Sequence, residues 1–459
     1  MASVQQSDKV NDILEGSIPR TLKRMTIPMI FGMITLMMFN LVDTFFISML
    51  GTEQLAAVSF TFPVTFTVIS LAIGLGIGTS AVIAKALGSG NIEEARFDAT
   101  VALLMSAVFV FLLSLIGFLL IEPIFSRLGA NQDVMPYIYD YISIWFLGSV
   151  FLITPMIGNS VLRASGDTKT PSYIMGLAGL INAILDPLLI FGVGPFPELG
   201  IKGAAIASVI AWSVAVAIIL YLLAIKKRLL SVNPGQQGVL SASKKILKIG
   251  FPAAGANMLT PIAMAVMTAI VASYGPQAVA AFGVGSRIES IASLVVLALS
   301  MTLPPFVSQN YGAQNFDRVK QAYKSSLKFV MYFQFAIYAV LLASSSLISR
   351  TFGNDPEVIR VIELFIYILP LSYGFQGVII LTNSSLNALH KPMNALVLSV
   401  VRLFVFYVPL AFVGSHFWGL QGLFIGAAFG NLLTAIVSYQ WFCRSLERMH
   451  RASIERSTS

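Results

Sequence analysis

Three acidic side chains, Asp43, Asp186 and Glu289, lie inside long apolar segments of the sequence. A carboxylate in the middle of a membrane helix costs about 2.5–3.5 kcal/mol, so it needs a partner, water or a function. Asn182 precedes Asp186 by four residues, which places both side chains on one face of a helix. We interpret Asp43, Asp186 and Asn182 as a protonatable cluster that binds H+ or Na+. The alternative is a pair of structural acids satisfied by hydrogen bonds.

Other side chains in these segments are candidates for lining a substrate cavity. Glu289 lies two positions after Arg287, so the two point to different faces of a helix and need not pair. Glu289 could line a cavity or join the two lobes, and a structural role is the alternative. Methionine recurs every four residues from Met25 to Met37, and a flexible thioether surface suits varied apolar ligands. Ordinary helix packing explains the same stripe. The cavity candidates are Asn40, Met33, Met37, Tyr141, Asn159 and Glu289.

No pattern in the sequence indicates an enzyme. The three histidines, His390, His416 and His450, are scattered, and neither a metal-ligand spacing nor a nucleophile motif occurs. A Gly-Leu-Gly-Ile-Gly run ends at Gly78, but no strand precedes it, so close helix packing explains it better than a nucleotide loop. We expect no metal and no organic cofactor, with H+ as the coupling ion and Na+ as the alternative.

The elements that must position these residues are membrane helices. Hydrophobic residues make up 56% of the chain and charged residues only 11%, against about 25% in a soluble domain. The mean hydropathy is +0.82. Apolar segments of about 20 residues can cross a bilayer. We expect an all-α polytopic protein with twelve spans, at 26–50, 58–84, 98–121, 137–158, 172–191, 200–223, 249–273, 279–309, 325–347, 361–382, 394–414 and 420–442.

The positive charges predict the topology. Of the 29 Lys and Arg residues, 23 lie at the two termini and in every second loop, whereas the alternate loops hold four. By the positive-inside rule, both termini are cytoplasmic. The first apolar run is too long for a signal peptide, so we expect a multi-pass protein of the plasma or inner membrane. The net charge of +8 therefore reflects topology, and we expect a monomer in the lipid bilayer that binds no nucleic acid.

The chain contains an internal repeat with an offset of 224 residues. The matched positions are Pro28 and Pro252, Gly51 and Gly275, Gly88 and Gly312, Asn91 and Asn315, and Asn159-Ser160 and Asn383-Ser384. Beyond a cytoplasmic turn the offset becomes 219, which pairs Gly200 with Gly419. Such a repeat predicts a two-lobed transporter. We divide the chain into a lobe at 1–225, a cytoplasmic linker at 226–248 and a lobe at 249–459.

The repeat also shows where the copies differ. Each half has six helices, an even number, so the two halves run parallel and rocking of the lobes is the expected mode of transport. Asp43 corresponds to Met267 and Asp186 to Val405, so neither acid has a polar counterpart. Two similar lobes are therefore predicted, with the chemistry in the first alone.

Several motifs together resemble the multidrug and toxic compound extrusion (MATE) transporters. They are the helix from Pro28 to Asp43, the Gly51-x-x-x-Leu-Ala-Ala turn, Arg163-Ala-x-Gly-Asp-Thr, and Asn182-x-x-x-Asp186-Pro-x-x-Ile-Phe-Gly. The likeness covers nearly the whole chain, and the two aspartates are similar to those of the DinF-like branch. It implies a V-shaped antiporter that expels organic cations in exchange for an inward cation.

In DinF-like members the acids of the first lobe are linked to proton coupling and to bending of helix 1 at its proline. The resemblance therefore assigns matching roles to Asp43, Asn182, Asp186, Asn159 and Tyr141, with Pro28 as the hinge. NorM-like members place acids in helices 7 and 10 instead, and this chain has none inside helix 7, which favours H+. One departure is Ala204, where some relatives have threonine; Ser208 lies one turn further on.

These observations predict a cation-coupled multidrug efflux antiporter that works by alternating access. The substrates would be small-molecule drugs and organic cations. The alternative is a flippase for lipid-linked precursors in a related two-lobed fold. A lipid pyrophosphate needs several cations, and only Arg287 and Arg402 lie within spans, so this alternative is weaker.

Overall fold

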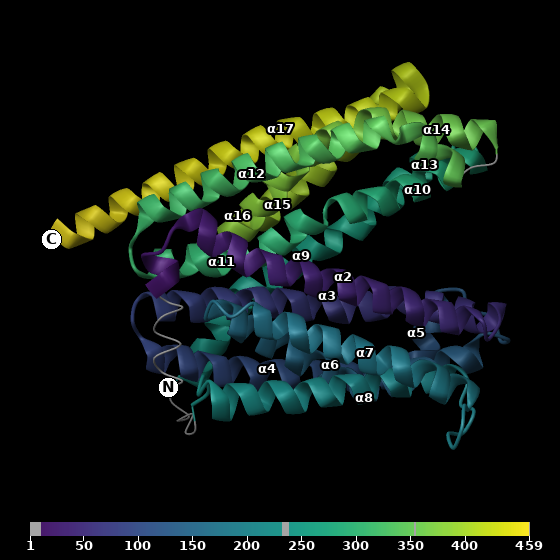
Figure 1. Cartoon of the computed structure of the whole chain (residues 1–459), viewed down its shortest axis with the longest axis horizontal. Helices are drawn as coiled ribbons and strands as arrows, with labels where there is room; N and C mark the ends of the chain where they lie inside the picture. The colour runs from purple at the N-terminus through teal and green to yellow at the C-terminus, as the bar shows by residue number, and fades with distance from the viewer. Residues whose placement is uncertain (1–10, 232–237, 353–354, 459) are drawn as a thin grey trace. The chain divides into compact units, whose positions relative to one another are not determined.

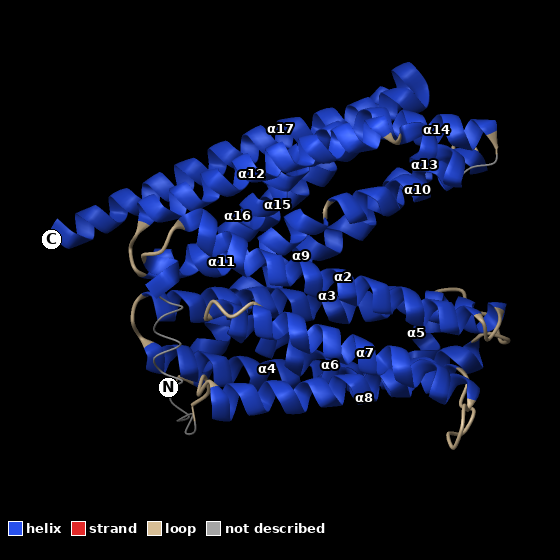
Figure 2. Cartoon of the chain, viewed as in Figure 1, coloured by secondary structure: helices blue, strands red, loops and turns tan. Residues whose placement is uncertain are grey.

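The computed structural model describes residues 11–231, 238–352 and 355–458, and in these ranges it contains helices and no strands (Figures 1 and 2). An apolar chain in lipid must satisfy its backbone hydrogen bonds internally, and helices do so within one segment. The elements are α2 (Ile18–Ser48), α3 (Thr52–Gly88), α4 (Ile92–Leu119), α5 (Ile121–Arg127), α6 (Met135–Ala164), α7 (Lys169–Phe191), α8 (Ile201–Tyr221), η1 (Leu222–Lys226), α9 (Val239–Ala272), α10 (Pro276–Ala292), α11 (Leu294–Gly312), α12 (Phe316–Ala343), α13 (Ser345–Phe352), α14 (Pro356–Ile368), η2 (Leu369–Ser372), α15 (Tyr373–Ala388), α16 (Pro392–Val400), η3 (Val401–Tyr407) and α17 (Val408–Thr458).

The all-α membrane architecture expected from the sequence is confirmed. Ten helical stretches in the described ranges are long and apolar enough to cross a membrane. An eleventh span is the pair α10 and α11, which is bent by 42°. The last stretch, Pro392–Glu455, is interrupted at Trp418 and Gly419, where the backbone is not helical, and this break separates the two final spans expected.

Three boundaries differ from the expected ones. The first helix begins at Ile18 rather than near residue 26, so Pro28 lies inside a continuous helix and does not break its start. The span expected at 361–382 is made of α14 and α15, joined by a 3-10 turn at Leu369–Ser372. The linker expected at 226–248 overlaps η1 and the start of α9, while residues 232–237 lie outside the described ranges.

The chain forms two compact units. The first comprises Met1–Glu15 and Ile27–Ala254, and the second comprises Gly16–Thr26 and Gly255–Ser459. The change from one unit to the other thus falls inside α2 and inside α9, close to the matched prolines Pro28 and Pro252. In the first unit α6 packs against α3, α4 and α8, and in the second α15 packs against α11, α12 and α17. Since α6 carries Asn159 and α15 carries Asn383, the central helices of the two units are repeat equivalents.

The backbone repeats as the sequence does. Positive φ angles recur at matched positions, namely Gly51 (138°) and Gly275 (102°), Gly90 (79°) and Gln314 (59°), Gly166 (82°) and His390 (57°), and Gly200 (55°) and Gly419 (59°). The same turn is therefore kept even where the second copy lacks glycine. The internal repeat is therefore confirmed at the level of local backbone conformation.

The glycine run of α3 serves close helix packing within the first unit. A Cβ atom on Gly74 would collide with the carbonyl oxygen of Gly250 in α9. One on Gly78 would lie 2.5 Å from the carbonyl oxygen of Ile246, also in α9, and one on Gly76 would lie 2.7 Å from Oγ of Ser160. The contacts bear out the packing interpretation, because only glycine allows the two backbones to approach so closely.

The Arg163-Ala-x-Gly-Asp-Thr motif fixes the start of α7. Gly166 makes the left-handed turn after α6, and the buried Asp167 accepts hydrogen bonds from the backbone N and Oγ1 of Thr170, at 3.3 and 3.0 Å. Lys227, just beyond η1, donates to Asp167 at 2.8 Å. The motif therefore ties α7, which carries Asn182 and Asp186, to the end of α8 and η1.

Candidate functional site

Asp43 on α2 and Asp186 on α7 meet inside the first unit. Their carboxyl groups are close enough to share a hydrogen bond. Two ionised carboxylates this close repel each other, so the arrangement favours a proton on one of them. Asp186 is fully buried, and Oδ1 of Asp43 and Oδ2 of Asp186 have no hydrogen-bond partner. The geometry suits uptake and release of protons.

Asn182 connects this pair to a third helix. Its side-chain amide donates to Oδ1 of Asp186 at 3.3 Å and lies 3.2 Å from Oγ of Ser208 on α8. The shared helix face expected for Asn182 and Asp186 is thus present. Ser208 supplies a hydroxyl to the network one turn beyond Ala204, which is itself buried among apolar side chains. Tyr141 on α6 lies near both carboxyl groups, within range of their charges.

An apolar layer covers one side of the acidic pair. Ile47 and Ile190 follow Asp43 and Asp186 by four residues, which is about one helical turn. These two isoleucines and Ala204 are buried together, with Tyr141 and Phe191 packed against them. Because apolar side chains offer water no hydrogen bonds, this layer separates the acidic pair from the loop end of its helices.

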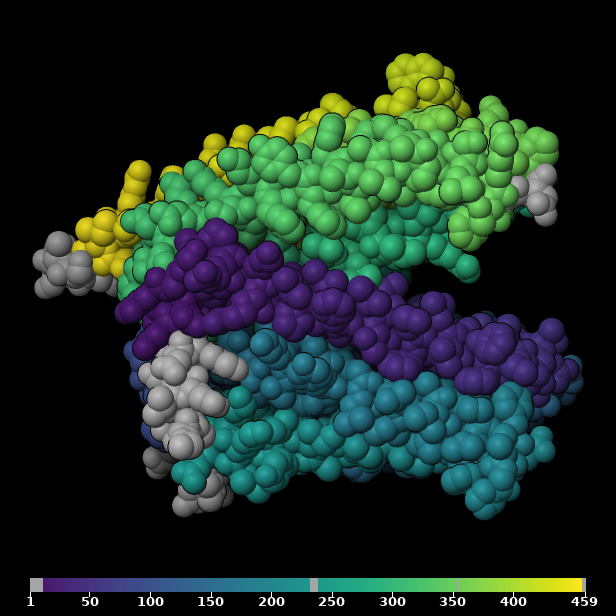
Figure 3. Space-filling view, in the orientation of Figure 1, coloured from purple at the N-terminus to yellow at the C-terminus, as the bar shows by residue number. Residues whose placement is uncertain are grey.

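Of the other residues predicted on α2, some are buried in helix packing and others are exposed at the surface. Met25 and Met29 are fully buried, and the hydroxyl of Ser172 donates to Sδ of Met29 at 3.7 Å. Met33 is half-buried, whereas Met37 and Asn40 are exposed. The methionine stripe is therefore packing at its first two positions. Phe31, Met38 and Leu41 are exposed as well, and α2 is visible at the surface in Figure 3.

Asn159 and Glu289 lie outside the acidic pair. Asn159 is buried near the end of α6, its Oδ1 atom lacks a partner, and no hydrogen bond in the described part of the chain joins it to Asp43 or Asp186. Glu289 lies on α10 of the second unit, where it accepts a hydrogen bond from Nε2 of Gln376 at 2.8 Å.

A polar cluster in the second unit was not foreseen from the sequence, which had placed the chemistry in the first lobe alone. Arg402 on η3 is close enough to Glu289 for their charges to interact. Tyr373 and Tyr407 are buried within range of the same carboxylate. We call Arg402, Glu289, Tyr373, Gln376 and Tyr407 the Arg402 cluster. Glu289 and Arg402 inside spans were the only sequence signals for it.

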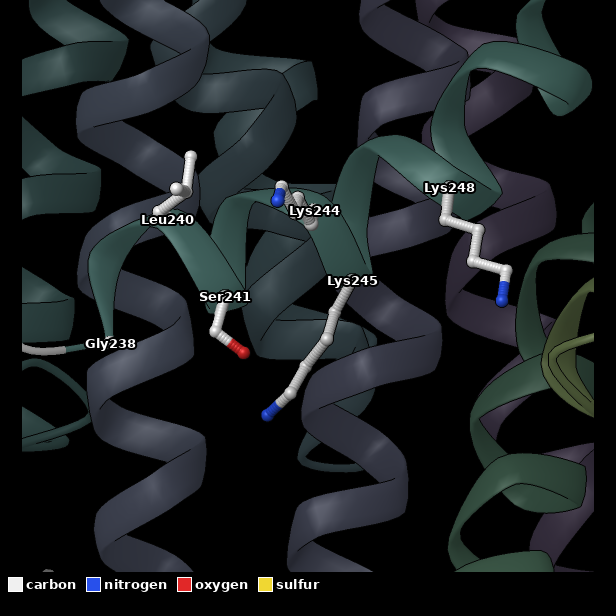
Figure 4. A pocket seen from close by; sticks show the side chains of 6 residues that line it. All are labelled: Gly238, Leu240, Ser241, Lys244, Lys245 and Lys248. Atoms are coloured by element: carbon white, nitrogen blue, oxygen red, sulfur yellow. The ribbon is translucent and has the colours of Figure 1, made fainter.

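A recess of about 560 Å³ lies at the start of α9, but its side chains are not arranged to bind one ligand. It is lined by Gly238, Leu240, Ser241, Lys244, Lys245 and Lys248. The three ammonium groups point in different directions (Figure 4). Lys245 is already engaged by Glu94 at 2.6 Å and lies 3.9 Å from Asp98. These lysines therefore do not converge on one ligand.

Comparisons with known proteins identify the family and agree with the two-lobed fold. The MatE family model matches residues 28–188 and 252–413, one match in each copy of the repeat. The chain is 44% identical over 428 residues to a protein of Shewanella oneidensis named FAD transporter, covering 93% of this chain and 95% of that protein. It is 25% identical to the multidrug export protein MepA of Staphylococcus haemolyticus, over 89% of this chain and 90% of that one.

Solved structures show the same fold. The crystal structure of the Vibrio cholerae MATE transporter VcmN in the bent form superimposes with a TM-score of 0.90 and 34% identity. The match covers 96% of this chain and 99% of that chain. The family match and the apolar helices together describe a multi-pass membrane transporter rather than an enzyme.

Proposed function

Since the chain belongs to the MATE family of multidrug-type transporters, we propose that it is a proton-coupled exporter of the DinF-like branch, with both termini in the cytoplasm. The observation that supports H+ as the coupling ion is the proximity of the Asp43 and Asp186 carboxyl groups, which favours a proton on one of the two. Carboxylate pairs that share a site exchange protons readily, because the second charge is disfavoured by the first. Na+ is the alternative coupling ion.

For the substrate we propose FAD first and organic cations second. The relative named FAD transporter is 44% identical over nearly the full length of both chains, whereas MepA is 25% identical. The organic cations expected from the family resemblance therefore have the weaker support. FAD combines flat aromatic rings with two phosphates, so the site that binds it needs both apolar surface and cationic donors.

In the proposed cycle, protons reach the pair from the outer side when that side is open. Protonating the second carboxyl group removes its charge and changes the hydrogen bonds of Asn182 and Ser208, which couples the charge state to the packing of α2, α7 and α8. Substrate then leaves outward, and the protons leave inward after the units rearrange. The proline inside α2, Pro28, leaves one backbone carbonyl without its helical partner and allows α2 to bend.

Proteoliposomes loaded with FAD provide the test. Wild-type protein should release FAD several times faster under an imposed proton gradient, while an equal Na+ gradient should have little effect. Asp43→Asn and Asp186→Asn should lose this acceleration because an amide cannot exchange protons. Asp140→Asn is the matched control, because Asp140 lies in the same unit and pairs with Lys202 at 3.2 Å on the surface.

Each possible result of this assay tests a different part of the proposal. If Asp43→Asn inserts normally and keeps full acceleration by the proton gradient, the assigned coupling site is wrong. If wild type responds to Na+ and not to H+, the coupling ion is wrong. If ethidium is exported and FAD is not, the chain is a cation exporter as the family resemblance first implied.

A further inference from the structure

Arg402 is a guanidinium inside a membrane span that no ion pair satisfies. Its Nε atom is buried and has no hydrogen-bond partner, and no carboxylate among the described residues forms an ion pair with it. A guanidinium keeps its charge in proteins and offers five donors, so leaving it unpaired in a membrane helix is costly. Such a residue usually marks a functional site.

The Arg402 cluster contains one further donor without a partner. The hydroxyl of Tyr373, a residue only 3% exposed, has no hydrogen-bond partner. Glu289 is the nearest charge of opposite sign, but its Oε1 atom already accepts from Gln376 at 2.8 Å. The cluster therefore holds a buried cationic donor and a buried hydroxyl donor that both lack an acceptor.

The local backbone also sets this region apart. Arg402 lies on η3, a seven-residue π-helical segment at Val401–Tyr407 inside the helix that begins with α16. π-helical turns within α-helices occur frequently at functional sites, because they re-aim side chains at the cost of regular hydrogen bonds. In the first unit the corresponding helix, α7, carries no basic residue after Lys169. The cation is thus specific to the second copy of the repeat, as the aspartates are to the first.

We propose that the Arg402 cluster binds the phosphate groups of the transported molecule, an inference that rests on the proposed export of FAD. The planar guanidinium matches the geometry of phosphate oxygens and forms two parallel hydrogen bonds with them. Tyr373 donates a further hydrogen bond through its hydroxyl. Glu289 is the internal counter-ion, which offsets the charge of Arg402 until a phosphate replaces it.

An organic cation does not fit this cluster equally well, because Arg402 repels it. The sign of the charge therefore separates this inference from a general drug-binding surface. It also predicts opposite effects for two neighbouring substitutions. Removing Arg402 should weaken anion binding, and removing the charge of Glu289 should strengthen it, whereas a purely structural Glu289–Arg402 contact predicts damage from both.

Binding to the full-length protein in nanodiscs tests this inference without requiring transport. FAD and riboflavin share the isoalloxazine ring, and riboflavin lacks the phosphates. Flavin fluorescence should show wild type binding FAD at least about tenfold more tightly than riboflavin. Arg402→Gln should reduce that preference to about twofold or less, Arg402→Lys should restore part of it, and inorganic pyrophosphate should compete with FAD for wild type. Tyr373→Phe should weaken FAD binding several-fold and leave riboflavin unchanged.

Two further variants complete the test. Glu289→Gln should bind FAD more tightly than wild type, since the amide still accepts from Gln376 but no longer competes as an anion. Arg287→Gln, which changes an exposed arginine on α10, should behave as wild type. The inference is overturned if wild type shows no preference for FAD over riboflavin, if Arg402→Gln keeps the preference, or if Glu289→Gln and Arg402→Gln weaken FAD binding alike. Phosphate-dependent binding without proton-driven efflux would refute the proposed coupling and leave this inference standing.

Discussion

Replacing Gly74 by alanine tests how closely α3 and α9 must pack. A Cβ atom at this position would lie 2.6 Å from Cβ of Ala254 and 2.7 Å from its backbone N, whereas ordinary contacts begin at 3.4 Å. The carbonyl oxygen of Gly250 would be closer still, so relieving all three contacts requires the helices to separate by about 1 Å. The obstructing atoms belong mainly to the backbone, so rotating a side chain cannot relieve them.

The cost follows from two opposing effects. Overpacking a dense core costs about 1–3 kcal/mol, while alanine is favoured over glycine in a helix by about 1 kcal/mol. With rigid obstructing atoms we take the upper end of the first range and expect a net loss of about 2 kcal/mol in the free energy of unfolding. For a unit of this size, that lowers the melting temperature by about 4–8 °C.

The assay is thermal unfolding of the purified protein in detergent. The control is Gly283→Ala on α10, where the glycine is exposed and an added Cβ would have no neighbour within 4 Å. That variant should melt at the wild-type temperature or about 2–4 °C above it. If Gly74→Ala melts as high as Gly283→Ala, close packing is not what requires glycine at position 74.

Two further predictions concern the contact between Asp167 and Lys227 and the charge moved during transport. Asp167→Ala should destabilise the first unit by about 1–3 kcal/mol, because Lys227 loses its partner and Thr170 loses both hydrogen bonds. Thermal unfolding should show a smaller loss of stability for Asp167→Asn. Equal losses for the two variants would show that the charge of Asp167 is what matters. If one proton enters as FAD leaves with a negative charge on each phosphate, about three charges move per cycle, so 100 mV of inside-negative potential contributes about 7 kcal/mol. Valinomycin-imposed potentials in proteoliposomes should therefore accelerate FAD efflux when the inside is negative, and efflux that ignores the potential would refute this charge count.

The acidic pair could be predicted from the sequence, but its surroundings could not. Asp43 and Asp186 stand out because ionisable residues are rare in membrane spans, and the spacing of Asn182 places it beside Asp186 on any helix. The partners of Glu289 gave no such signal. Gln376 lies 87 positions away, and tyrosines are common at membrane interfaces, so only the packing of α10, α15 and η3 identifies them. The sequence likewise did not show that α2 continues through Pro28, which membrane helices tolerate because neighbouring groups can satisfy the freed carbonyl.

Comparing the two copies of the repeat shows that each copy has candidate functional residues that the other lacks. Residues found only in the first copy include Asp43 and Asp186, whose carboxyl groups lie close together. Residues found only in the second copy include Arg402, whose buried Nε atom has no hydrogen-bond partner. Shared positions such as Gly51 and Gly275 keep the same turn, because both units need the same backbone. A duplicated scaffold with the Asp43–Asp186 pair in one copy and Arg402 in the other can separate proton binding from anion binding. Changing single side chains on a shared scaffold is enough to place the two binding functions in different units, and no new fold is needed.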